Sequence, residues 1–148
     1  MRSAAVLVVL VVLAGCGGSD DGSIRVTNQP PECAGDSAAL LKALGAAPGR
    51  VTVDGRPISR CFTRNQDSTE LQVLGTGFLA AAQQLGDRAA ADPGAALQLG
   101  YLIGAARRGA QRYGVADEMV RRLEGETGAL GPNRAAYGRG LRAGLAQG

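Results

Sequence analysis

From Asp67 onward, apolar residues recur every three or four positions, which is the period of an α-helix that packs one face against a core. The clearest stripe, within about 100° of arc, comprises Leu71, Leu74, Phe78, Ala81, Ala82, Leu85 and Ala89. Glu70 follows Asp67 at the spacing of a capping box, in which two side chains bond to each other's backbone N–H groups. The pattern therefore predicts a long helix that begins near Asp67 and has one polar side.

A second helix is predicted between Asp92 and Tyr113. Asp92-Pro93 combines an N-cap residue with a proline at the first helical position. Apolar residues occupy two opposite sides of this helix, namely Leu99, Leu102, Ile103, Ala106 and Ala110 on one side and Leu97 and Tyr101 on the other. We therefore expect it to be central in the fold, and we expect Gly100 and Gly104 to let another backbone approach closely.

Two shorter helices are predicted after Gly114. Residues 116–124 have apolar positions at Met119, Val120 and Leu123. Pro132 can open a last helix, in which Tyr137, Leu141 and Leu145 recur every four residues. Glycines at 138, 140 and 144 lower the helix propensity of this last segment.

The N-terminal half is poorer in large apolar residues. Residues 51–53 and 58–62 flank Asp54-Gly55, a dipeptide that suits the positive φ angles of a tight hairpin turn. This pattern predicts a small β-hairpin, in which Pro57 favours an edge position because proline has no N–H donor.

These elements predict a mainly α fold: a small bundle of three to four helices with a short disulfide-tied N-terminal segment that includes the hairpin. Three parts follow along the chain: a signal peptide over 1–15, a tether and extended lead-in over 16–35, and one mainly helical domain over 36–148. Asp36 is expected to cap the first, short helix of that domain.

The first residues have the pattern of an export signal. Arg2 precedes an uninterrupted run of eleven apolar residues, 4–14, which is shorter than the about 20 residues needed to span a bilayer. The run closes with Leu13-Ala14-Gly15-Cys16, which resembles the lipobox of bacterial lipoproteins. The resemblance implies transfer of a diacylglyceryl group to the Cys16 sulfur, cleavage before Cys16, and acylation of the new amino terminus with a chain such as palmitate. An ordinary signal peptide and a buried apolar element are the alternatives.

With this interpretation, the membrane is a partner through the acylated N-terminus. The protein is expected to be exported and anchored to the bacterial cell membrane by lipid, with its globular part outside the cytoplasm. Residues 17–23 are polar and rich in glycine, which is typical of a flexible tether.

The remaining cysteines, Cys33 and Cys61, are most simply a disulfide in an exported chain. A redox-active pair or a metal site is the alternative, but the two cysteines do not form a C-x-x-C motif and the chain has no histidine to complete a zinc site. No metal and no cofactor is therefore expected.

Composition excludes several function classes. The 148 residues contain 15 Arg, one Lys, no His and five aromatic residues. Without histidine there is no Ser-His or Cys-His couple, and few aromatics make a base-stacking platform for nucleic acid improbable. From residue 16 onward, 15 basic side chains face 13 acidic ones, without a basic tail, so no nucleic-acid partner is expected.

One set of arginines is the candidate contact surface, able to hold a phosphate, a carboxylate or a lipid headgroup: Arg107, Arg108, Arg112, Arg121 and Arg122. Interleaved acidic residues, Asp117 and Glu118 among them, also suit a solvated face of ion pairs.

No catalytic residue is predicted. Asp67, Glu70 and Asp92 lie where helix caps explain them, and the glycine clusters lack the spacing of a phosphate loop. The predicted function is a binding or structural module that contacts an envelope protein or an anionic group. An enzyme is the less favoured interpretation. A small cell-envelope hydrolase with a carboxylate mechanism and a carrier of an apolar ligand are the alternatives.

Overall fold

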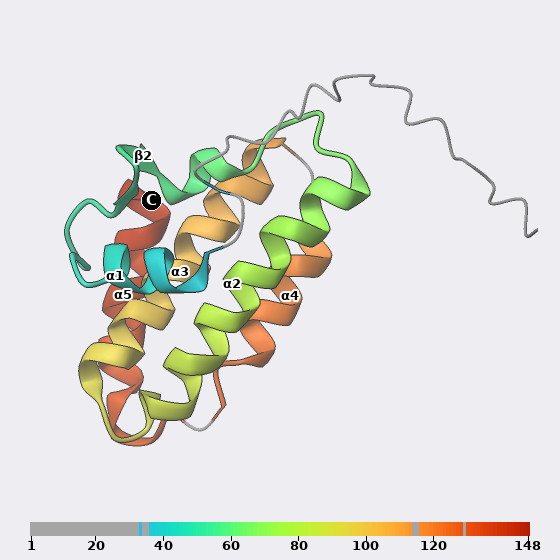
Figure 1. The fold of residues 1–148 in the computed structure, drawn as a ribbon. Helices are drawn as coiled ribbons and strands as arrows, with labels where there is room; N and C mark the ends of the chain where they lie inside the picture. The colour runs from blue at the N-terminus through green and yellow to red at the C-terminus, as the bar shows by residue number, and fades with distance from the viewer. Residues whose placement is uncertain (1–32, 34–35, 114–115, 129) are drawn as a thin grey trace, which may run out of the picture.

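Four helices lie side by side and alternate in direction in the computed structural model (Figure 1), which describes residues 33, 36–113, 116–128 and 130–148. They are α2 (Ser68–Ala89), α3 (Pro93–Tyr113), α4 (Asp117–Gly125) and α5 (Arg134–Gln147). The short helix α1 (Ser37–Leu44) lies across them. The predicted mainly α bundle with a short N-terminal segment is confirmed.

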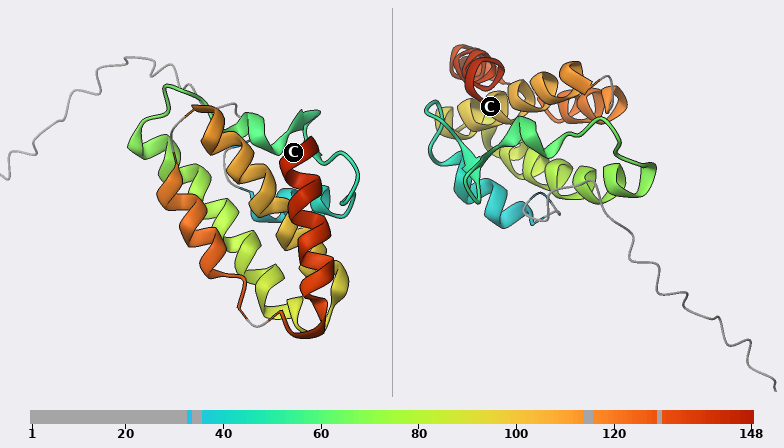
Figure 2. Two further views of the ribbon diagram at one scale, coloured as in Figure 1. Left: turned by 180° about the vertical axis from the view of Figure 1, so that it is seen from behind. Right: turned by 90° about the horizontal axis from the view of Figure 1, so that it is seen from above.

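Helix α3 is the central element, as its two apolar sides predict. It packs against α5, α2, α4 and the 3₁₀ helix η2 (Ile58–Cys61), and the views of Figure 2 show α5 and α2 on different sides of it. Leu99, Leu102 and Tyr101 are fully buried. The Val51 N–H donates a hydrogen bond to the Tyr101 hydroxyl at 3.1 Å, so the N-terminal segment is tied directly to the core.

Helices α3 and α5 are in backbone contact through their glycines. A Cβ atom on Gly100 would overlap the carbonyl oxygen of Tyr137, and one on Gly140 would overlap that of Leu97 and lie 2.9 Å from the Tyr101 nitrogen. Gly104 and Gly144 meet the facing helix in the same way. The expected close approach at Gly100 and Gly104 is confirmed, and α5 is the helix that makes it.

The buried face of α5 differs from the expected apolar stripe. Leu145 is 36% exposed, and Tyr137 and Leu141 are only partly buried. The buried residues are Ala136, Gly140 and Gly144. Small residues take this face because they alone permit backbone-to-backbone packing, so the glycines that weaken the isolated helix form its tertiary contact.

Helix α2 follows the prediction closely. The Asp67 side chain accepts a hydrogen bond from the Glu70 N–H at 2.8 Å, and Glu70 accepts one from the Asp67 N–H at 3.1 Å, which completes the capping box. Of the predicted stripe, Leu71 is only partly buried and the other residues face the core, namely Leu74, Phe78, Ala81, Ala82, Leu85 and Ala89.

The hairpin is shorter than predicted. Strands β1 (Thr52–Val53) and β2 (Arg56–Pro57) pair antiparallel around Asp54 and Gly55, which both have positive φ. The predicted second arm over 58–62 is wrong, because residues Ile58–Cys61 form η2. Pro57 cannot extend the ladder with an N–H, and the next residues pack on α3, where Phe62 and the Ser59 carbonyl fill the space above Gly109.

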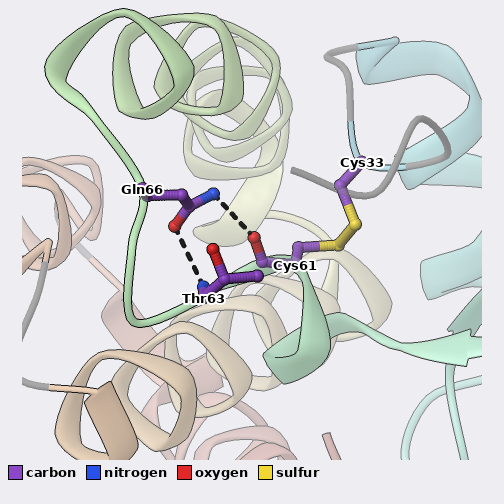
Figure 3. The surroundings of a disulfide bond; sticks show 4 residues. All are labelled: Cys33, Cys61, Thr63 and Gln66. Atoms are coloured by element: carbon purple, nitrogen blue, oxygen red, sulfur yellow. Dashed lines mark hydrogen bonds between the residues drawn. A yellow bond between two sulfur atoms is a disulfide. The ribbon is translucent and has the colours of Figure 1, made fainter. Parts of the chain in front are cut away.

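Cys33 and Cys61 form the predicted disulfide, which ties the segment before α1 to the end of η2 (Figure 3). Both residues are buried. Beside the bridge, the Gln66 side chain accepts a hydrogen bond from the Thr63 N–H at 3.1 Å and donates one to the Cys61 carbonyl at 2.9 Å. The disulfide and Gln66 together hold the turn that leads from η2 into α2.

Candidate functional site

The five arginines of the predicted contact surface occupy different surroundings. Arg107 on α3 donates a hydrogen bond from Nε to Glu124 on α4 at 2.7 Å, with about a third of each side chain exposed. Arg108 donates to the carbonyl oxygens of Leu145, at 2.9 Å, and Ala146, and so caps the last turn of α5. The Arg108 contact stabilises the fold, because a cation at a helix C-terminus bonds to carbonyls that have no partner within the helix.

The two arginines of α4 share one carboxylate. Arg122 lies 3.0 Å from Glu118, and Arg121 pairs with the other oxygen of the same carboxylate. Arg112 is exposed in the last turn of α3 and has no ion pair among the described residues. Exposed pairs of this kind stabilise a fold little, so Arg121 and Arg122 are partnered without being strongly held.

A groove of about 630 Å³ lies between α2 and α4. Its apolar part consists of Leu71, Leu79, Met119 and Gly75. A Cβ on Gly75 would make ordinary contact with the Met119 sulfur, at 3.5 Å, so α2 and α4 lie close together at this point. Polar side chains line the same groove, from α2 Ser68, Gln72 and Thr76 and from α4 Asp117, Glu118 and Arg122. Of the five predicted arginines, this groove contains Arg122 alone.

Arg107 and Arg121 line a second, smaller depression between α3 and α4, of about 310 Å³, with Asp117 and Glu124. Its charged groups are of both signs, and the ion pair between Arg107 and Glu124 closes one side. Burial raises the pKa of the nearby Tyr137 hydroxyl above its ordinary value, and Arg107 opposes this shift.

Sequence reasoning missed a third group of arginines, on the outer side of α5. Arg134, Arg139 and Arg142 are all exposed and surround a shallow depression with Pro132, Ala135 and Gly138. The signal was present in the sequence, since no acidic residue follows Glu126. It was hidden because charge was balanced over the whole of residues 67–148.

The carboxylates considered for catalysis are helix caps. Asp67 and Glu70 hold the capping box of α2, and Asp92 accepts a hydrogen bond from the Gly94 N–H at 2.7 Å at the start of α3. Within the described ranges, no group of three or more acidic or cysteine side chains could hold a metal ion.

The glycines considered for a phosphate loop lie inside helices. Gly75 and Gly77 lie inside α2, and Gly138 and Gly140 lie inside α5, so none forms a loop that could cradle a phosphate. At Gly100 and its partners, the facing backbone fills the space between α3 and α5. An apolar ligand has no room between those helices at the glycines.

Cys16 and its lipobox lie outside the described residues. In the part of the chain that the structure describes, no helix is long and apolar enough to cross a membrane. No known protein family, curated protein sequence or solved structure matches the chain, so its function is argued from its own residues.

Proposed function

We propose that the chain is an exported lipoprotein whose helical domain is a binding module, held at the membrane surface by lipid on Cys16. The motif Leu13-Ala14-Gly15-Cys16 supports the anchor. The disulfide supports export, because it pairs Cys33 with Cys61 and such bonds persist in oxidising compartments. It also leaves Cys16 as the one cysteine of the chain outside the bridge.

Replacement of Cys16 by serine is expected to abolish lipid attachment, because the acyl transfer needs a sulfur nucleophile. Intact-mass spectrometry of the chain from bacterial membranes should show a diacylglyceryl-modified product that begins at residue 16, and the variant should lack both modification and cleavage there. Ser19→Ala, three residues beyond, should be processed like the wild type. A variant that still gains lipid mass would rule out the anchor.

The groove between α2 and α4 is the observation that carries the binding function. Its lining runs from Ser68 to Leu79 along α2, twelve residues or about 16 Å of helix. Leucine and methionine give it an apolar floor, and methionine adapts to different partner surfaces. Polar side chains at its edges can fix orientation. An elongated apolar floor with polar edges suits the apolar face of an amphipathic segment of a partner protein.

A photo-crosslinking amino acid at Thr76, which lines the groove and is exposed, is expected to capture this partner in intact cells. The matched control is the same amino acid at Val73, which is 43% exposed on the same helix but does not line the groove. We expect one discrete protein adduct from position 76 and none from position 73. Equal adducts at both positions, or none at either, would refute the groove as the binding site. An adduct to lipid would favour the carrier function.

A further inference from the structure

Helix α5 carries positive charge that no acidic residue of the same helix balances. From residue 16 onward there are 15 basic and 13 acidic side chains, and α5 contributes three arginines and no acidic residue. Without those three, 12 basic side chains face 13 acidic ones. Helix α3 also has three arginines and no acidic residue, but its Arg107 pairs with Glu124 and its Arg108 bonds to carbonyls of α5, whereas the α5 arginines have no such partners among the described residues.

These three residues, Arg134, Arg139 and Arg142, form what we call the α5 arginine face. They project from the side of the helix opposite Gly140 and Gly144, which contact α3. Because the glycine contact is backbone to backbone, α5 has a fixed orientation and its arginine side is turned away from the bundle. In Figure 2, α5 lies at the edge of the helical layer, so this side is open along the helix.

Among the described residues, the arginines of the α5 arginine face have no carboxylate partner, in contrast to three of the five arginines of the predicted contact surface. Arg107, Arg121 and Arg122 pair with Glu124 or Glu118. Within the described ranges, none of the three α5 guanidinium groups has an ion pair, and the residues lining the depression between them include no Asp or Glu. A guanidinium without a competing carboxylate is available for bidentate bonds to phosphate.

We propose that the α5 arginine face docks on the anionic headgroups of the membrane that carries the chain. This inference rests on the proposed lipid anchor, which keeps the domain near a negatively charged surface. The 18 residues from Cys16 to Cys33 reach at most about 60 Å, so the domain stays within a short distance of the bilayer. A tether of this length keeps the domain at a high effective concentration beside the headgroups, so weak contacts suffice to orient it. Docking through α5 would lay the bundle on the membrane.

Vesicle binding by the unlipidated chain from residue 17 onward tests the proposal without the anchor. This chain is suitable because it keeps every described residue and contact. We expect it to sediment with vesicles of equal parts phosphatidylcholine and phosphatidylglycerol, and not with phosphatidylcholine alone. Binding should fall steeply between low salt and about 1 M salt, where the screening length is about 3 Å.

The variant Arg134→Glu, Arg139→Glu, Arg142→Glu should bind the anionic vesicles at least about 100-fold more weakly, since each arginine near such a surface contributes about fivefold. The control Arg50→Glu, Arg60→Glu, Arg64→Glu changes the net charge equally at three exposed arginines elsewhere. It should bind much more tightly than the α5 variant. Thermal unfolding of both variants should match the wild type, because all six residues are exposed.

Three results would overturn the proposal: no binding to anionic vesicles, an equal loss in both triple variants, or binding to soluble polyphosphate without binding to vesicles. The last would assign the face to a soluble polyanion. Failure of the anchor is a separate result, since it is measured from the mass of Cys16 in cells.

Discussion

Replacing Gly140 by alanine is expected to lower the free energy of unfolding by about 3 kcal/mol or more, the upper range for overpacking a core. The added methyl carbon would overlap the Leu97 carbonyl and lie 2.9 Å from the Tyr101 nitrogen. Both clashing groups are backbone of α3, the central helix, so no side-chain rotation relieves the contact. The two helices must move apart. We expect the thermal unfolding midpoint to fall by more than about 10 °C.

Gly138→Ala is the matched control on the same helix. Its Cβ would meet only the end of the Arg142 side chain, at 3.6 Å, which is ordinary contact. Alanine is favoured over glycine within a helix by about 1 kcal/mol, so this variant should be as stable as the wild type or more stable. The pair thus separates helix propensity from interhelical packing. If both variants unfold at the same temperature, the close contact between α3 and α5 is wrong.

Reduction of the Cys33–Cys61 disulfide is expected to lower the free energy of unfolding by about 3.6 kcal/mol. The bond closes a loop of 28 residues, and this figure follows from the chain entropy that such a loop removes from the unfolded state. The bridged segment is also held by α1 on α2, by the Val51–Tyr101 hydrogen bond and by η2 on α3.

Urea unfolding of the chain from residue 17 onward, with and without a reducing agent, measures this contribution. The variant Cys33→Ala, Cys61→Ala should resemble the reduced wild type and should not respond to the reducing agent. Equal stability of the oxidised and reduced wild type would contradict the prediction. Free thiols at both positions in the protein isolated from cells would show that the bridge does not form there.

The candidate site was predictable only in part. The sequence predicts Arg107, Arg121 and Arg122 as charged groups on neighbouring helices, and they lie on α3 and α4, which pack together. Their pairing with Glu118 and Glu124 depends on how α3 and α4 are rotated, which charge counts do not give. The groove between α2 and α4 has no sequence signature, because it is the space that two packed helices leave between them.

Local signals by themselves determined where the long helices begin and which one is central. The capping box at Asp67 and the N-cap at Asp92 act over three or four residues, so their physics is contained in the sequence around them. The disulfide was also predictable, since only two cysteines remain beside Cys16. The lipobox resemblance is of the same local kind and remains a prediction.

Only the tertiary structure decided what the glycines of α5 do and which side of that helix is free. By propensity Gly140 and Gly144 weaken a helix, and Leu141 and Leu145 are the natural candidates for its buried face. In the structure the two glycines form the buried face of α5 instead. They meet Gly100 and Gly104 of α3, and the two backbones can come into contact only where neither helix has a Cβ. That contact, made between residues about 40 positions apart, orients α5 and thereby turns its three arginines outward.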